Sequence, residues 1–471
     1  MVLAAVAGLA LVTVPAYAAP PEGASGAGAG PFVLRMPGVA GDSSSGATFD
    51  PGVMASGIRV CRFLPGVSQA AILGPAATEP TAAPAPSPVQ SAVVPAVTQS
   101  QLETFDGAAA AVVSKYVDPG INGLGWGAVT AQYRAMVQAG MTNAEFDKLM
   151  KLYIGELEDG HSYYLSAQEV IEQEEAIEHG ASLVGIGASI SGHPDGSATV
   201  IYVIPGSPAQ GAGIRPHDLL LTANGLPISL PDGTITTRGE AGTPVTVQVK
   251  RGKEPAFPVV MVRAAISAPA TVDYCTVAGT RIAYIFLPTF LDASITGQVR
   301  AALQKLTASG PLSGVVIDNR MNGGGLSTEA TGVLGFFTSG NHGAYVSRTS
   351  STPFQITAEP IGNSQTVPLV VLVGEETVSF GEIFSGVLDR ASRATIIGVR
   401  TNGNVELLNP TNFSDGSRIW LAQSTFQPVG LPAGAWEESG IVPDFVENGQ
   451  WHEFTELDDP GLARAIAVLS D

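Results

Sequence analysis

The spacing of apolar residues divides most of the chain into three regions. Over 101–180 apolar side chains recur every three or four positions, a period that predicts amphipathic helices. Over 181–266 short alternating runs are separated by glycine turns, which predicts a small β-domain. Over 267–471 short apolar runs alternate with helical segments, as in a sheet whose strands are buried on both faces. The sequence therefore predicts an α/β (α+β multidomain) protein with an N-terminal helical segment, a β-domain and an α/β core with a mainly parallel buried sheet.

The individual elements follow from the same pattern. The helical region is expected to have helices around two sets of apolar residues, Phe105, Ala109, Val112, Val113 and Tyr116, then Phe146, Leu149, Met150, Tyr153 and Leu157. In the α/β core, strands are expected at 282–287, 314–318, 369–373 and 394–397, with helices near 293–308, 326–338 and 380–391.

The N-terminal hundred residues have a different character. Residues 1–18 are apolar and end in Ala16-Tyr17-Ala18, the small-x-small pattern that precedes a signal-peptidase cut, although the usual positive n-region is missing. Either this is a signal peptide, which the cleavage pattern favours, or it is an apolar tail. Residues 19–100 are rich in Gly, Ala, Ser and Pro and are typical of a linker or N-terminal extension. No later apolar run is long enough to span a membrane, so no stable membrane span is expected.

Charge and cysteine content narrow the possible partners. The formal net charge is −19 with only 23 Lys plus Arg, and such a surface repels nucleic acid and anionic lipid. Cys61 and Cys275 are the two cysteines, and they can pair in an oxidising compartment. Neither has a second Cys or a His at ligand spacing, so no metal site is predicted.

Two predicted strand–turn–helix junctions carry the candidate chemistry. One follows the strand that ends at Asp318 and contains three consecutive glycines, 323–325; the other follows the strand at 369–373 and contains Ser379. Such a junction exposes its turn residue and directs the backbone N–H groups of the helix start toward whatever binds there. A Ser beside a glycine-rich donor loop supplies the parts needed for acyl transfer. Taken alone, a Ser before a helix is more often an N-cap than a nucleophile.

These segments resemble motifs of a known family. Segment 318–325 resembles the Asp-Leu-Arg-x-Asn-x-Gly-Gly motif, and 377–383 the Thr-Ala-Ser-Ala-Ser-Glu-Ile motif, of carboxyl-terminal processing (tail-specific) serine peptidases. Further family-like segments follow in the expected order, at 398–404, 415–417, 440–444 and 459–468. The resemblance covers about 101–471, and it implies that 267–471 is the peptidase core.

The β-domain carries a resemblance of its own. Segment 204–214, with its Pro-Gly-Ser-Pro-Ala start, and segment 217–225, which ends in Asn-Gly, resemble a PDZ domain of the bacterial protease type. A PDZ domain over 181–266 implies capture of an extended carboxyl-terminal tail at a sheet edge. It could instead only brace the catalytic core.

The family resemblance implies roles for individual residues. The nucleophile falls on Ser379, and the oxyanion hole on the backbone N–H of Phe380 together with Gly324 or Gly325. The family needs no metal and no organic cofactor, so none is expected here.

The general base departs from the commoner family pattern. Many members use a Lys in a Thr-Phe-Gly-Lys-Gly segment, where this chain has Asn404, and no lysine occurs after Lys305. An amide does not titrate, so a Ser–Lys dyad is excluded. The tricorn-like branch of the family uses His and Glu instead, and its pattern falls on His161 and Glu437, with Glu438 as the alternative acid. His161 could also be structural; as a base we expect it to titrate near the ordinary pKa of His.

The sequence therefore predicts a secreted or periplasmic (extracytoplasmic) serine endopeptidase that acts on polypeptide substrates. The PDZ domain is expected to capture the free C-terminal tails of these substrates or to gate the active site. The alternative is a non-catalytic protein on the same fold that binds peptides or apolar ligands.

Overall fold

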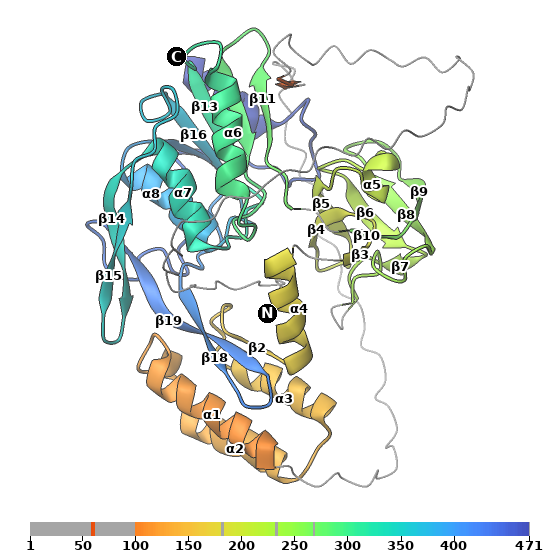
Figure 1. Ribbon diagram of the computed structural model, residues 1–471, viewed down its shortest axis with the longest axis vertical. Coiled ribbons are helices and arrows are strands. Elements are labelled where there is room, and N and C mark those ends of the chain that lie inside the picture. Colours follow the sequence, from red (N-terminus) through yellow and green to blue (C-terminus); the bar gives the residue numbers. More distant parts are fainter. Residues whose placement is uncertain (1–57, 62–98, 180–182, 231–233, 267–268, 471) are drawn as a thin grey trace, which may run out of the picture.

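The computed structural model describes residues 58–61, 99–179, 183–230, 234–266 and 269–470. The predicted signal peptide and nearly all of the predicted linker lie outside the described residues. Figure 1 shows a layered α/β core in green and blue, a small β unit in yellow-green beside it, and a group of orange and yellow helices at the opposite end.

The core is built on a seven-stranded sheet. Its strand order is β1-β11-β12-β13-β16-β17-β20, and every neighbouring pair is parallel except β11 with β12. The strands are β1 (Val60–Cys61), β11 (Asp273–Val277), β12 (Ile282–Phe286), β13 (Gly314–Asp318), β16 (Leu369–Val373), β17 (Thr395–Gly398) and β20 (Phe445–Val446). A mainly parallel sheet was predicted and is confirmed.

Helices cover both faces of this sheet, and successive strand residues alternate between them. Val315 and Ile317 of β13 pack in the cluster formed with α6 (Ile295–Thr307), α7 (Ser327–Phe337) and α8 (Phe380–Arg390). Val316, between them, packs with residues of α9 (Pro460–Ser470) on the other face. Because both faces are buried, the strand is apolar except for Asp318 at its end, and the sequence predicted β12, β13, β16 and β17 and the helices α6, α7 and α8 with errors of one or two residues at their ends. Strands β1, β11 and β20 were not predicted.

A second sheet joins the core to the helical region. Its path is β15-β14-β19-β18, and β2 also pairs with β19. The strands are β2 (Tyr163–Leu165), β14 (Gly340–Ser347), β15 (Ser351–Ile356), β18 (Leu407–Asn412) and β19 (Arg418–Pro428). In Figure 1 the β18–β19 hairpin leaves the core and passes over the helices. Ile419, Leu421 and Ala422 of β19 complete the helical core, so the helical region does not bury its apolar face alone.

The helical region contains α1 (Gln99–Lys115), the short 3₁₀ turn η1 (Ile121–Gly123), α2 (Trp126–Gln138), α3 (Asn143–Gly155) and α4 (Ala167–His179). The two predicted apolar sets lie on α1 and α3 and the residues just after each, while α2 was not predicted. At the start of α3 the Thr142 side chain accepts from the Glu145 N–H and the Glu145 carboxylate accepts from the Thr142 N–H, a capping box that fixes the beginning of the helix.

The small β unit has its own core. Its main sheet follows β4-β5-β6-β8-β9 with β7 against β6, and β3 pairs with β10. The elements are β3 (Leu183–Gly185), β4 (Ala188–Gly192), β5 (Ala198–Val203), α5 (Pro208–Gly211), β6 (Leu219–Ala223), β7 (Leu226–Pro227), β8 (Pro244–Lys250), β9 (Phe257–Val262) and β10 (Ala264–Ile266). Buried aliphatic residues such as Val200, Leu220 and Val247 form its centre.

Cys61 and Cys275 form a disulfide that ties β1 to β11. Among the described helices, none is both long enough and apolar enough to cross a membrane.

Candidate active site

Ser379 lies in the turn between β16 and α8 with a backbone that a non-glycine residue rarely adopts. Its φ is 56° and its ψ is −122°, and its side chain is partly exposed. Such a conformation costs free energy of order 1–3 kcal/mol, and it persists only where the surroundings hold it in place. Ser379 is therefore held at the head of α8 with its hydroxyl accessible.

Glu382 supplies much of that hold. Its buried carboxylate accepts hydrogen bonds from the Ser379 N–H at 3.1 Å, the Gly403 N–H at 2.7 Å, the Asn404 N–H at 2.8 Å and the Thr401 hydroxyl at 2.5 Å. Burial raises the pKa of Glu382, and these hydrogen bonds oppose that rise. The side chain therefore joins the start of α8 to the loop 401–404. Glu382 matches the Glu of the family motif, but nothing in the sequence revealed that its carboxylate makes this connection.

The glycine loop lies directly against Ser379. A Cβ on Gly324, whose φ is +90°, would come within 2.8 Å of the Ser379 Cβ and 3.0 Å of the Phe380 nitrogen. The Gly324 N–H donates to the Asn322 Oδ1 at 2.9 Å, so it is already used. Within the described residues no hydrogen bond uses the N–H of Gly325 or of Phe380, the first residue of α8. Of the two glycines named as alternatives, Gly325 is the one that keeps a free donor in this conformation.

His161 and Glu437 are brought together from distant parts of the chain. His161 lies in the turn before β2, and its Nε2 is 3.0 Å from the Glu437 Oε1. The imidazole is only 3% exposed and the carboxylate 23%. Burial alone would lower the pKa of His161, but the hydrogen bond and charge of Glu437 outweigh it, with help from Glu406 and Asp159. The net effect raises this pKa, so His161 differs from the ordinary His that the sequence suggested.

The loop 403–405 connects this pair to Ser379. The Asn404 carbonyl accepts from the Ser379 N–H at 2.9 Å, and the Val405 N–H donates to the Glu437 Oε2 at 2.9 Å. The Asn404 side-chain amide also donates to the Gly160 carbonyl, next to His161, at 3.3 Å. One loop thus contacts Ser379, Glu437 and Gly160, the residue before His161. In the described part of the chain, no hydrogen bond yet joins the Ser379 hydroxyl to His161.

Two further carboxylates near the site have different environments. Glu438, the alternative acid, is exposed, and its N–H donates to the Gly403 carbonyl. Glu406, which the sequence did not single out, lies just before β18, and its Oε2 is buried without a hydrogen-bond partner among the described residues. Burial raises the pKa of Glu406 to about 8; His161 opposes this shift, while the charge of Glu437 adds to it.

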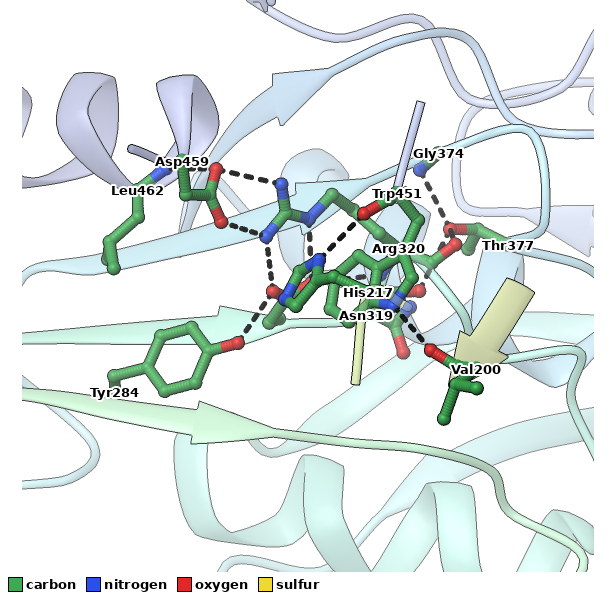
Figure 2. A network of polar contacts seen from close by, with 11 residues as sticks. Val200, His217, Tyr284, Asn319, Arg320, Gly374, Thr377, Trp451, Asp459 and Leu462 are labelled. Atoms are coloured by element: carbon green, nitrogen blue, oxygen red, sulfur yellow. Dashed lines mark hydrogen bonds and ion pairs between the residues drawn. The ribbon is translucent and has the colours of Figure 1, made fainter. Parts of the chain in front are cut away.

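A buried ion-pair network around Arg320 holds the residues just before the glycine loop. Arg320, two residues before Asn322, is held between Asp318 and Asp459, and its guanidinium carbon lies 5.0 Å from the centre of the Trp451 ring. Figure 2 shows Arg320 with Asp459 and Trp451. His217 of the small β unit stacks on the same Trp451 with ring centroids 3.9 Å apart. His217 therefore packs against the core, and its burial lowers its pKa.

Residues 281–447 match the model of Peptidase family S41. The chain is 28% identical to the "C-terminal processing peptidase, chloroplastic" of Tetradesmus obliquus, over 74% of this chain and 77% of that protein. It is also 28% identical to the "Carboxy-terminal processing protease CtpA" of Bacillus subtilis, over 63% of this chain and 62% of that protein, which is less than two thirds of the relative.

Among solved structures, the photosystem II D1 C-terminal processing protease aligns with a TM-score of 0.55 and 25% identity, covering 75% of this chain and 94% of that one. The order of motifs, the fold and these relatives agree with one another. Residues 281–447 therefore match peptidase family S41, and the chain is a serine peptidase similar to those of the carboxyl-terminal processing type.

Proposed function

We propose that the chain is an exported endopeptidase in which Ser379 is the nucleophile, His161 the general base and Glu437 the acid that orients the base. The observation that carries this proposal is the buried His161–Glu437 pair, held by the same loop that holds Ser379. No lysine follows Lys305, and Lys305 itself is exposed on α6, so the loops around Ser379 offer no lysine base. A buried His beside a carboxylate is a group that can take a proton from a Ser hydroxyl.

The geometry suggests how the proton moves. Glu437 is hydrogen-bonded to Nε2 of His161, so Nδ1 is the nitrogen that receives the Ser379 proton. The alkoxide oxygen then attacks the scissile carbonyl, and the oxyanion is stabilised by the N–H groups of Phe380 and Gly325. The His161 proton passes to the leaving amine, which gives an acyl-enzyme. Water that loses a proton to His161 hydrolyses the acyl-enzyme, and the Ser379 hydroxyl is restored. Ser379 and His161 would need to approach each other when substrate binds, as catalytic contacts often tighten only then.

The proposal extends to the small β unit and to the compartment. We assign residues 181–266 to a PDZ domain that binds substrate tails at a sheet edge, since β4 and β9 are the outer strands of its main sheet. Peptides with a free C-terminal carboxylate should then be cleaved faster than their amidated forms, and equal rates would leave the unit a structural brace. The Cys61–Cys275 disulfide supports an oxidising, extracytoplasmic location.

The test of the enzyme against a mere binding protein is hydrolysis of casein. Ser379→Ala should reduce the rate by about 10⁴-fold or more while the circular dichroism spectrum stays unchanged. Ser439→Ala is a matched control, because its hydroxyl is exposed and donates only to the Ala435 carbonyl. A Ser379→Ala protein that still cleaves casein would show that Ser379 is not the nucleophile, and a wild-type chain without hydrolysis would favour the non-catalytic alternative.

A further inference from the structure

A cluster of three potential metal ligands lies beside the proposed base. One ligand atom from each of His161, Glu406 and Glu437 lies within 4.8 Å of the other two. His161 comes from the turn before β2, Glu406 from the residue just before β18 and Glu437 from the loop after β19. Three segments that are distant in the sequence therefore meet here, and the fold brings these side chains together.

Glu406 is the member of the cluster whose environment is incomplete. Both oxygens of Glu437 have partners, Oε1 in His161 and Oε2 in the Val405 N–H. The Oε2 of Glu406 is buried and has no hydrogen-bond partner within the described residues. A buried carboxylate oxygen without a donor is costly, and it is satisfied either by a proton or by a cation. With the carboxylate of Glu437 nearby, ionisation of Glu406 would place two negative charges around a single imidazole.

We propose that His161, Glu406 and Glu437 together bind one Zn²⁺ ion, and that the bound ion inhibits the peptidase by occupying the base. The binding half of this proposal stands on the cluster alone, whereas the inhibition half rests on the proposed role of His161. One nitrogen and two carboxylate oxygens are ligands that Zn²⁺ accepts, with a fourth position left for water. Two carboxylates also neutralise the charge of the ion. Zn²⁺ binds nitrogen and oxygen ligands more tightly than Mn²⁺ or Fe²⁺ does, so it is the ion to test first.

The distances require only small movements. The His161 Nε2 and the Glu437 Oε1 are 3.0 Å apart, and two ligands of a tetrahedral zinc ion with bonds of about 2.0–2.1 Å lie about 3.3 Å apart. The ion would take the Nε2 lone pair in place of the proton shared with Glu437, and the remaining ring proton would lie on Nδ1, which then cannot accept the proton of Ser379. Glu406 must move closer, and no hydrogen bond to its Oε2 holds it back. The Val405 N–H would keep Glu437 oriented, as hydrogen bonds to ligands do in known metal sites.

Binding is measured on the full chain carrying Ser379→Ala, so that hydrolysis plays no part. Competition between the protein and a chromophoric zinc chelator should give one Zn²⁺ per chain. Adding Glu406→Gln should weaken binding by about tenfold or more, because even an outer-shell partner is worth about 10–100-fold. Adding Glu158→Gln is the matched control, since this carboxylate is exposed and only three residues from His161; binding should be unchanged.

Inhibition is measured on the chain with Ser379 intact. Zn²⁺ should abolish casein hydrolysis, a chelator should restore it, and Glu406→Gln should raise the inhibitory concentration by the same factor that it weakens binding. A second variant, His161→Ala in the Ser379→Ala chain, should also lose binding, which guards against a folding defect specific to Glu406→Gln. The site is wrong if the parent chain takes up no Zn²⁺, or if both variants bind it as the parent does. If Zn²⁺ binds through Glu406 but hydrolysis continues, inhibition through the base is refuted while the peptidase activity stands.

Discussion

Replacing Arg320 with Met removes a buried cation while nearly keeping the side-chain length. The Arg320 side chain is 11% exposed, and its partners Asp318 and Asp459 are 0% and 4% exposed. Its guanidinium makes paired contacts with both carboxylates, at 2.9 and 2.5 Å to Asp318 and at 3.0 and 2.5 Å to Asp459. Met fills a similar space but leaves two carboxylates buried side by side. Breaking a buried pair in this way costs about 3–5 kcal/mol, because the remaining charges lose their partner.

The loss of unfolding free energy in Arg320→Met should depend on pH in a definite direction. Burial alone would raise the pKa of Asp459, but Arg320 more than offsets it and holds this pKa below the ordinary value. The stabilisation from Asp459 is therefore complete above its unfolded pKa of about 3.9, and it disappears as the pH falls through the lower folded pKa. In Arg320→Met the burial effect remains without the cation, so Asp459 should take up a proton at higher pH. The deficit in unfolding free energy should be largest near pH 7 and smaller near pH 5.

Urea unfolding followed by tryptophan fluorescence measures this deficit, since Trp451 lies directly against Arg320. Arg300→Met is the matched control. Arg300 makes the same paired contact with Glu359, at 2.8 and 2.7 Å, but that pair is exposed to solvent. Its loss should barely move the urea midpoint. If both variants lost the same stability, or if the Arg320→Met deficit did not change with pH, the network would not be the brace described here.

Two further predictions concern the catalytic residues. The pH at which kcat/KM rises should lie above the ordinary pKa of a His side chain, because the pKa of His161 is raised and the base must be unprotonated. Glu437→Gln should lower both this pH and the rate. A pH profile that does not shift in Glu437→Gln would contradict the pairing of His161 with Glu437. Gly381→Ala should impair hydrolysis because its Cβ would come within 2.4 Å of the Asn322 carbonyl oxygen and displace the glycine loop. Gly323→Ala, whose Cβ meets nothing within 4 Å, should keep nearly full activity, and equal loss in both would refute this reason.

The sequence predicted the α/β core well because its strands are buried on both faces. Apolar runs such as 369–373 have no polar position to confuse the pattern, and the helices between them carry one apolar stripe. The second sheet was missed for the opposite reason. Strand β18 contains Asn409, Pro410 and Asn412, and it is held by pairing with β19 rather than by its own composition.

Only the site residues that belong to recognisable motifs could be predicted from the sequence. Ser379, His161 and Glu437 were named from the order of motifs, and the structure places the last two in contact. The roles of Glu382 and Glu406 could not be predicted, because a Glu in a sequence gives no sign that its carboxylate will be buried. The use of the Gly324 N–H by Asn322 depends equally on local backbone geometry, which residue types alone do not reveal.

The most direct test of the central claim is the rate at which a fluorophosphonate modifies the chain, with the modified residue identified by mass spectrometry. This reaction needs an activated Ser but no bound polypeptide, so it separates activation of the nucleophile from substrate capture. The wild-type chain should be modified at Ser379 alone. His161→Ala should slow the modification by about 100-fold or more, because the general base is lost. Modification of Ser379 at the wild-type rate in His161→Ala, or modification at another residue, would contradict a Ser379 nucleophile activated by His161.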